Sequence, residues 1–161
     1  MIHPVLRWPD QILTTVAAQA CVDAPTLALA RDMLETMYAA NGRGLAAPQI
    51  GVLSRVFVMD AAWKTGDPVP EVFINPEILW RSPQMALGAE GCLSIPGVVA
   101  EVMRHSELVL QWQMADGSSQ AQKLTGFRAI CAQHEIDHLD GIVTLDRLPP
   151  EARAAAIAVL G

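Results

Sequence analysis

The stretch His134-Glu135-Ile136-Asp137-His138 has the pattern HExxH and lies in a run of helical periodicity that Asp140-Gly141 ends. On a helix, residues four positions apart share one face with their Cβ atoms about 5 to 6 Å apart, so two imidazoles could bind one ion at about 2.0 to 2.1 Å each. Glu135 would project beside them and reach a water rather than the ion. A lone histidine on an apolar helix face is more often a hydrogen-bonded core residue, so the motif needs support from the rest of the chain.

An open catalytic site of the zinc type needs three protein ligands, and the chain offers few candidates for the third. No histidine follows His138, and Glu151 is the one downstream carboxylate that would make the chain an HExxH metallopeptidase. Cys131 stands about 10.5 Å from His138 along the helix axis, at about 1.5 Å per residue, which is too far to share its ion. We therefore predict that Cys131 is a core residue, and we predict the same for Cys21.

Cys92 has a different setting, because it follows a predicted strand and precedes the Pro96-Gly97 turn. A thiol in this position can point across a sheet toward a packed helix. The alternative for Cys92 is a small buried hydrophobic residue. From the residues alone, both alternatives stay open.

Composition and charge limit the classes of protein to which the chain can belong. It has 161 residues, of which 52% are hydrophobic and 17% charged, so we expect one folded domain over residues 1–161. The net charge of −6 argues against a nucleic-acid substrate, because such binding depends on Lys and Arg neutralising phosphates. We find no signal peptide and no membrane span, and we expect a cytoplasmic protein. Three cysteines are an odd number, which disfavours a disulfide framework.

Periodicity divides the chain into a helix, a series of strands and a second helix. Residues 25–40 carry an apolar stripe at helical spacing, Asp23 can cap this helix, and Asn41-Gly42 ends it. Alternating or β-branched runs predict strands at 54–60, 71–75, 85–89, 98–104, 108–114 and 118–124, with a hairpin turn at Asp116-Gly117. A short C-terminal helix begins near Pro149. The predicted fold class is α+β, with mixed or antiparallel β-sheets packed around a central HExxH helix.

Three segments together resemble the peptide deformylase family, in the same order and with similar spacing. They are Gly42-Arg43-Gly44-Leu45-Ala46-Ala47-Pro48-Gln49, Glu90-Gly91-Cys92-Leu93-Ser94 and Gln133-His134-Glu135-Ile136-Asp137-His138, and the likeness runs from about Ile12 to Leu148. The resemblance implies that Cys92, His134 and His138 bind one divalent metal ion and that Glu135 is the general base. It also implies Fe²⁺ as the native ion, with Zn²⁺, Ni²⁺ or Co²⁺ able to replace it.

The resemblance also implies a reaction, which is hydrolysis of the N-formyl group from the N-terminal methionine of newly made polypeptides, with release of formate. By the resemblance, the Gln49 side-chain amide and the Leu93 backbone N–H are the donors that stabilise the negative charge developing on the formyl oxygen. Without the resemblance, Gln49 would be taken for a surface polar residue. Glu90 and Arg104 match a pair that braces the cysteine loop and the histidines, and a solvated surface pair is the alternative.

Arg43 and Gly44 belong to the segment that the resemblance places along the substrate. Gly44 would allow close approach of an extended peptide, whereas Gly42 is predicted to be an ordinary loop glycine. Arg43 stands where the family usually has a branched apolar residue, in a wall that lines the pocket for the first substrate side chain together with Phe127 and Ile130. We therefore expect weaker use of formyl-methionyl peptides, or a preference for substrates with an acidic or polar group.

The remaining alternatives concern the substrate and the partners. A deformylase-like paralogue with another substrate, or one that only binds peptides or metal, is an alternative, although no catalytic residue is visibly missing. The substrates implied by the resemblance are N-formylated nascent peptides. The segment after Leu148 is short, which leaves docking on the ribosome surface open.

Overall fold

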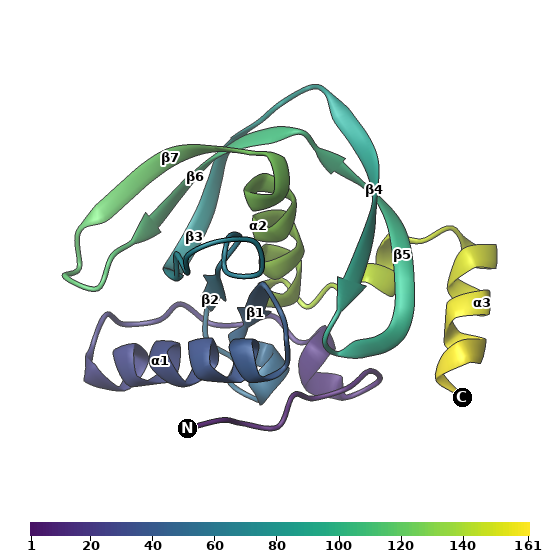
Figure 1. Cartoon of the computed structure of the whole chain (residues 1–161), viewed down its shortest axis with the longest axis horizontal. Coiled ribbons are helices and arrows are strands. Elements are labelled where there is room, and N and C mark those ends of the chain that lie inside the picture. The colour runs from purple at the N-terminus through teal and green to yellow at the C-terminus, as the bar shows by residue number, and fades with distance from the viewer.

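A computed structural model describes all 161 residues and shows two antiparallel sheets and three α-helices (Figure 1). The larger sheet has the strand order β1-β2-β3-β6-β7, and the smaller sheet pairs β4 with β5. The strands are β1 (Gly44–Ala46), β2 (Val56–Met59), β3 (Glu71–Arg81), β4 (Met85–Cys92), β5 (Ile95–His105), β6 (Glu107–Gln113) and β7 (Ser119–Thr125). The helices are α1 (Ala24–Ala39), α2 (Gly126–Leu139) and α3 (Pro150–Leu160), with short 3₁₀ helices η1 (Gln11–Thr14), η2 (Ala47–Ile50) and η3 (Thr144–Arg147). This is the predicted α+β class, and every pair of strands is antiparallel.

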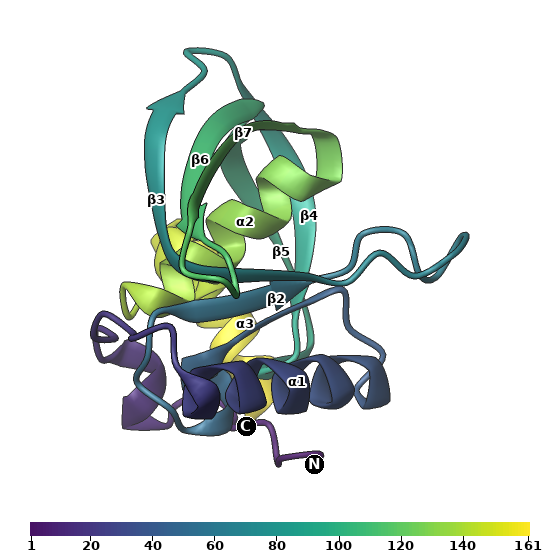
Figure 2. The ribbon, with the colours of Figure 1, turned by 90° about the vertical axis from the view of Figure 1, so that its left-hand side faces the viewer.

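Helix α2 lies in the middle of the molecule, between the large sheet and the β4–β5 hairpin (Figures 1 and 2). It contacts β1, β2, β6 and β7 of the large sheet and β5 of the hairpin. Every residue from Cys131 to Leu139 is buried, and Ile136 shares a core with the stacked rings of Phe57 and Phe73, whose centroids are 4.4 Å apart. Because burial of apolar surface is the dominant favourable term in folding, this core fixes the position of the HExxH helix.

The two outer helices cover the ends of the molecule. Helix α1 packs against β1 and β2, and α3 packs against β5 at the opposite end (Figure 1). The Asp23 carboxylate accepts a hydrogen bond from the Thr26 N–H at 2.9 Å, so the predicted cap is confirmed. The α3 helix begins at Pro150, as the paired prolines predict. No helix combines the length and the apolar character that a bilayer crossing requires.

The strands lie within two residues of their predicted bounds, except that β1 is additional, β3 and β4 end later, and β5 begins three residues earlier. β1 is an addition, because three residues (Gly44–Ala46) are too few to show a recognisable alternation. β3 continues to Arg81 instead of ending at Asn75, because its pairing with β6 resumes after a register shift between Ile74 and Glu77. Asn75 has a φ of 50°, and its side-chain amide bonds the backbone of Ala20 in both directions at 2.8 Å, which holds the irregular strand in place.

Cys21 is exposed, so its prediction as a core residue is wrong. It precedes the Asp23 cap and therefore lies outside helix α1, where no helical stripe determines its direction. Its neighbours Ala20 and Val22 pack against the core under the sheet. Cys21 stands between these two inward-facing residues and points to solvent.

Asp60 follows β2 and organises the loop between β2 and β3. Its buried carboxylate accepts hydrogen bonds from the Tyr38 hydroxyl at 2.5 Å and from the N–H groups of Ala62, Trp63 and Val69 at 3.0 to 3.1 Å. Burial raises the pKa of Asp60, but the hydrogen bonds outweigh burial and hold this pKa below its ordinary value. The charged form of Asp60 therefore stabilises the folded state.

Replacing Asp60 with alanine should lower the free energy of unfolding at neutral pH by about 3 kcal/mol, because the Tyr38 hydroxyl and three N–H groups lose their acceptor. Since the folded-state pKa is depressed, the stabilisation is present above the ordinary aspartate pKa and is lost as the pH falls through the depressed value. Urea unfolding of wild type and Asp60→Ala at neutral and acid pH measures both effects. Asp67→Ala is the control, since Asp67 is an exposed carboxylate of the same loop. Equal losses in the two variants would contradict the prediction.

Candidate metal centre

Three side chains with metal-ligating atoms meet where the end of β4 faces α2. Cys92, His134 and His138 each offer one ligand atom, and these atoms lie within 4.8 Å of one another. The Cys92 Sγ and the His138 Nε2 are 3.4 Å apart, and the centroids of the two imidazole rings are 5.1 Å apart. Atoms at these separations can share one coordination sphere after small adjustments of the side chains.

The end of β4 explains how Cys92 reaches the helix. The pairing of β4 with β5 is regular from Met85 to Gly91 and shifts register between Gly91 and Cys92. An irregularity of this kind at the end of a strand redirects the side chain beside it. Glu90, two residues before Cys92 along the strand, also faces α2, where its carboxylate contacts His134.

The residues around these ligand atoms fit a divalent cation. His134 uses Nδ1 for a 2.9 Å hydrogen bond to Glu90, which leaves Nε2 available to an ion. One carboxylate oxygen of Glu135 is buried without any hydrogen-bond partner, and so is Nδ1 of His138. Buried polar atoms are rarely left unpaired. A free carboxylate oxygen beside a thiol and two imidazoles is typical of an open site that takes a metal ion and a water molecule.

Burial and mutual contact shift the protonation equilibria of the metal-free site. Burial raises the pKa of Glu135 to about 7, against a smaller lowering by His134. Burial acts to lower the pKa of His134, but contacts with Glu135, Cys92 and Glu90 outweigh it and raise this pKa well above its ordinary value. Burial lowers the pKa of His138 well below its ordinary value. A ligand imidazole must be neutral, so an ion that binds here displaces the proton of His134.

Glu90 and Arg104 form a buried ion pair next to His134, so the alternative of a solvated surface pair is wrong. Arg104 Nε and Nη2 donate to the two Glu90 oxygens at 2.9 and 3.0 Å, and the side chains are only 4% and 6% exposed. Burial raises the pKa of Glu90, but hydrogen bonds from His134 and Arg104 outweigh burial and lower this pKa. The ionised carboxylate accepts the Nδ1 proton of His134 and thereby orients the ring.

Gln49 is buried, so the alternative of a surface position is wrong. It lies in η2, and its side-chain carbonyl accepts a hydrogen bond from the Ala46 N–H at 3.0 Å. Its amide nitrogen donates to the Ser94 hydroxyl at 3.0 Å and lies 3.7 Å from the Cys92 sulfur. The donor end of Gln49 therefore faces the ligand cluster.

Leu93 follows Cys92 in the turn between β4 and β5. Its backbone N–H makes no hydrogen bond to another backbone group. This donor is free to bond an oxygen atom held next to Cys92. Gln49 and Leu93 both line the cleft in front of the ligand cluster.

Gly44 has a packing role that the sequence does not predict. A Cβ atom at this position would lie 2.6 Å from a Glu135 carboxylate oxygen and 2.6 Å from the Cys131 sulfur. Gly42 is also more than the predicted loop glycine, because a Cβ atom there would lie 2.8 Å from the Leu93 side chain. Both glycines allow β1 and the turn before it to approach the site closely.

A cleft of about 590 Å³ opens in front of the ligand cluster. Arg43, Phe127 and Ile130 line its wall, and the Arg43 guanidinium carbon lies 3.9 Å above the centre of the Phe127 ring. Arg43 forms no ion pair with any carboxylate. The cleft therefore presents an uncompensated cation that is stacked on an aromatic ring.

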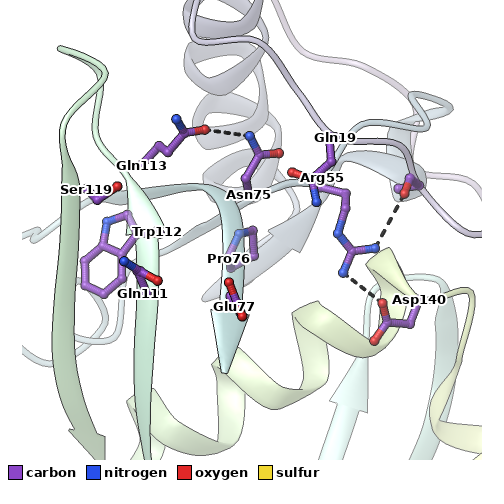
Figure 3. A pocket seen from close by; sticks show the side chains of 11 residues that line it. Gln19, Arg55, Asn75, Pro76, Glu77, Gln111, Trp112, Gln113, Ser119 and Asp140 are labelled. Atoms are coloured by element: carbon purple, nitrogen blue, oxygen red, sulfur yellow. Dashed lines mark hydrogen bonds and ion pairs between the residues drawn. The ribbon is translucent and has the colours of Figure 1, made fainter. Parts of the chain in front are cut away.

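A second hollow, of about 640 Å³, is polar and lies away from the ligand cluster (Figure 3). Its only cation is Arg55, which pairs with Asp140 at 2.8 Å and donates to the Leu139 carbonyl at 3.0 Å. None of the predicted site residues lines this hollow. The chemistry that the sequence indicates lies in the cleft instead.

Glu151 and Cys131 are both outside the ligand cluster. Glu151 is exposed in the first turn of α3 and contributes no atom to the cluster. The HExxH metallopeptidase alternative, which requires this carboxylate as a ligand, is therefore wrong. Cys131 is buried in the core as predicted, with its sulfur 4.0 Å from a Glu135 oxygen.

Comparisons of the sequence with known proteins agree on one family. A family model described as polypeptide deformylase matches residues 2–154. A peptide deformylase of Agrobacterium fabrum is 47% identical over 148 residues, which cover 91% of this chain and 87% of that protein. A peptide deformylase-like protein of Bradyrhizobium diazoefficiens is 42% identical over 148 residues, which cover 91% of this chain and 85% of that protein.

Solved structures of similar sequence share the whole fold. Peptide deformylase from Ehrlichia chaffeensis in complex with actinonin matches with a TM-score of 0.93 and 35% identity, covering 99% of this chain and 95% of that one. A peptide deformylase from Legionella pneumophila matches with a TM-score of 0.92 and 36% identity, covering 98% of this chain and 92% of that one. Sequence and fold thus agree that this chain belongs to the peptide deformylase family.

Proposed function

We propose that this chain hydrolyses the N-formyl group from the N-terminal methionine of newly made polypeptides and releases formate, with residues 1–161 as one catalytic domain. Deformylation of nascent peptides is the function of the family to which the chain belongs. One observation supports the assignment of this activity to particular residues. It is the approach of Cys92, His134 and His138 to within 4.8 Å, beside the unpaired oxygen of Glu135.

Cys92, His134 and His138 would hold one divalent ion in this proposal. When bound, the ion supplies a Lewis acid that lowers the pKa of water and polarises the formyl oxygen. We propose Fe²⁺ as the native ion and Zn²⁺, Ni²⁺ and Co²⁺ as substitutes, because one thiolate and two imidazoles suit all four. Glu90 would keep His134 in the tautomer that presents Nε2 to the ion.

Glu135 would move the proton during hydrolysis. Its unpaired oxygen is free to take the proton of the attacking water and to return it to the departing amine nitrogen. The absence of a side chain at Gly44 leaves the carboxylate the space that it occupies, since a Cβ atom there would lie 2.6 Å away. Glu135 can therefore stay close to the ligand cluster, with the Cys131 thiol on its other oxygen and the first oxygen free.

Gln49 and Leu93 would stabilise the negative charge that develops on the formyl oxygen. The Gln49 amide nitrogen lies 3.7 Å from the Cys92 sulfur, and the Leu93 N–H is next to Cys92 in the chain. Donors that are already oriented toward such a charge lower the barrier by on the order of 3 kcal/mol each. Both donors would act without a rearrangement of the backbone.

The proposed partners are N-formylated nascent peptides, which would enter the cleft past Arg43. Gly44 would lie along the peptide, and Phe127 and Ile130 would contact its first side chain. Docking on the ribosome surface would fall to α3, the last element of the chain, which has 11 residues.

Replacing Glu135 with glutamine should remove the activity and spare the metal. The amide has the same shape but cannot accept the proton, so kcat on a formyl-Met peptide should fall about 10²- to 10⁴-fold. Metal analysis of the anaerobically purified variant should still find the ion. Cys92→Ala should lose the ion itself, and Glu151→Ala should behave as wild type.

The same measurements separate the alternatives. A wild-type protein that binds metal but releases no formate would favour a paralogue that only binds peptides. Full metal content in Cys92→Ala would overturn the ligand assignment.

Replacing Arg43 with isoleucine should raise kcat/KM for a formyl-Met peptide by about 10-fold, because an apolar wall suits the methionine side chain better than a guanidinium does. The same change should lower kcat/KM for a formyl-peptide with an acidic first side chain. Formate release from both peptides measures the two effects. Arg81→Ile is the matched control, since Arg81 is exposed and outside the cleft. Unchanged ratios in Arg43→Ile would remove Arg43 as a determinant of specificity.

A further inference from the structure

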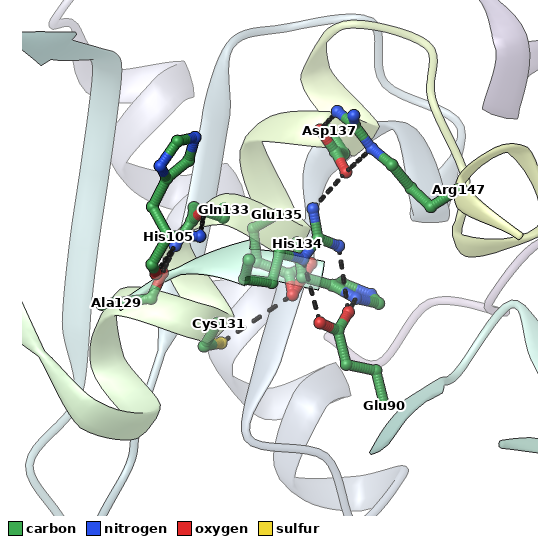
Figure 4. A network of polar contacts seen from close by, with 10 residues as sticks. Glu90, His105, Ala129, Cys131, Gln133, His134, Glu135, Asp137 and Arg147 are labelled. Carbon is green, nitrogen blue, oxygen red and sulfur yellow. Dashed lines mark hydrogen bonds and ion pairs between the residues drawn. The ribbon is translucent and has the colours of Figure 1, made fainter. Parts of the chain in front are cut away.

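A row of alternating charges runs from His134 through Glu90 and Asp137 to Arg147 (Figure 4). Beyond its pairing with Glu90, Arg104 donates from Nη1 to Asp137 Oδ2 at 2.6 Å. Asp137 also accepts hydrogen bonds from Arg147, at 3.1 Å from Nε and at 2.7 Å from Nη2. The contacts therefore join His134, Glu90, Arg104, Asp137 and Arg147 in that order.

The inner members of this row are shielded from water. The side chain of Asp137 is 11% exposed, and those of Glu90 and Arg104 are still more buried, whereas Arg147 is 43% exposed. Buried charges are tolerated only when they are paired and hydrogen-bonded. When His134 is neutral, as a metal ligand must be, one buried arginine stands between two buried carboxylates, so a second cation is needed to balance the row. Arg147 supplies it from the surface.

Arg147 and Arg104 share Asp137 as their acceptor. Asp137 Oδ1 has no donor other than Arg147 Nη2, so loss of Arg147 leaves this oxygen unpaired. Arg104 would then be drawn toward Asp137 to serve this oxygen, and its two hydrogen bonds to Glu90 would lengthen. Glu90 would then hold the His134 ring less firmly.

The positions of Asp137 and Arg147 in the chain suit a role at the metal centre. Asp137 lies on α2 between the two candidate histidine ligands, and Arg147 is the last residue of η3. Leu145, also in η3, is buried in a small core against which Cys92 packs. The segment after α2 thus contacts both the helix and the strand that carry the ligand atoms.

We propose that Asp137 and Arg147 are positioning residues of the metal centre. By balancing the charge of Arg104 they keep Glu90, and through it the His134 imidazole, in the orientation that binds the ion. This inference rests on the proposed function, which makes His134 a ligand. Groups that hydrogen-bond to metal ligands from behind typically change metal affinity by about 10- to 100-fold when they are removed.

The test is a measurement of Co²⁺ affinity, which needs no catalytic activity. Metal-free protein is titrated with Co²⁺ under anaerobic conditions against a competing chelator, and the thiolate-to-Co²⁺ absorption band is recorded. Arg147→Met and Asp137→Asn should raise the Kd by about 10-fold. Arg147→Lys should recover part of the affinity, because it restores the charge. Arg153→Met is the matched control and should bind as wild type does, since Arg153 lies in the following helix and in no ion pair.

The outcomes separate this inference from the proposed function. An unchanged Kd in Arg147→Met overturns the inference, and so does a loss of affinity that Arg153→Met shares or that Arg147→Lys does not relieve. Thermal unfolding of the metal-free variants shows whether a loss of affinity accompanies general destabilisation. Failure of the proposed function would look different, because wild type itself would then bind no Co²⁺, or Cys92→Ala would bind it equally well.

Discussion

The rest of the structure depends on the burial of α2, a helix that takes charged residues as well as apolar ones out of water. The buried polar residues of its second half are Gln133, His134, Glu135, Asp137 and His138. Burial of a polar group costs free energy unless another group bonds it, so the fold must supply partners from distant segments. Gln133, for example, bonds the backbone of His105 in both directions, at 2.9 and 3.1 Å (Figure 4). His134 and His138 belong to this group, and an ion can supply the partner that their ligand atoms need.

The β4–β5 hairpin supplies the charged partners because of its register. Alternation along the two strands turns Glu90 and Arg104 toward α2, while Leu87 and Met103 on the opposite face are exposed. A slip of one residue in either strand would turn its charged residue toward solvent. A buried ion pair adds little net stability by itself, since desolvation offsets much of the attraction. Its consequence here is geometric, because the paired carboxylate orients one imidazole.

Local patterns predict most of the elements, and contacts between distant segments explain what those patterns miss. The HExxH helix, the Asp23 cap and the hairpin turn at Gly117 depend on residues close together in the chain, and all three are present. Gln49 is buried only because η2 and the turn after β4 meet, and its own neighbourhood in the sequence carries no sign of this. Arg147 likewise gains its ion pair from the chain reversal after α2. Cys21 shows the opposite error, since residue type alone predicts burial at a position where no periodic pattern supports it.

Helical geometry places two nearby carboxylates of α2 in different surroundings. Glu135 and Asp137 are two positions apart, so their side chains leave the helix about 200° apart around its axis. Asp137 faces two arginines that hold both of its oxygens, whereas Glu135 faces Gly44 and keeps one oxygen unpaired. An arginine beside Glu135 would stabilise its charge but would occupy the oxygen that a proton needs. Burial therefore raises the pKa of Glu135 to about 7, whereas two arginines stabilise the charge of Asp137, and the carboxylate without such a partner is on the side of the cleft.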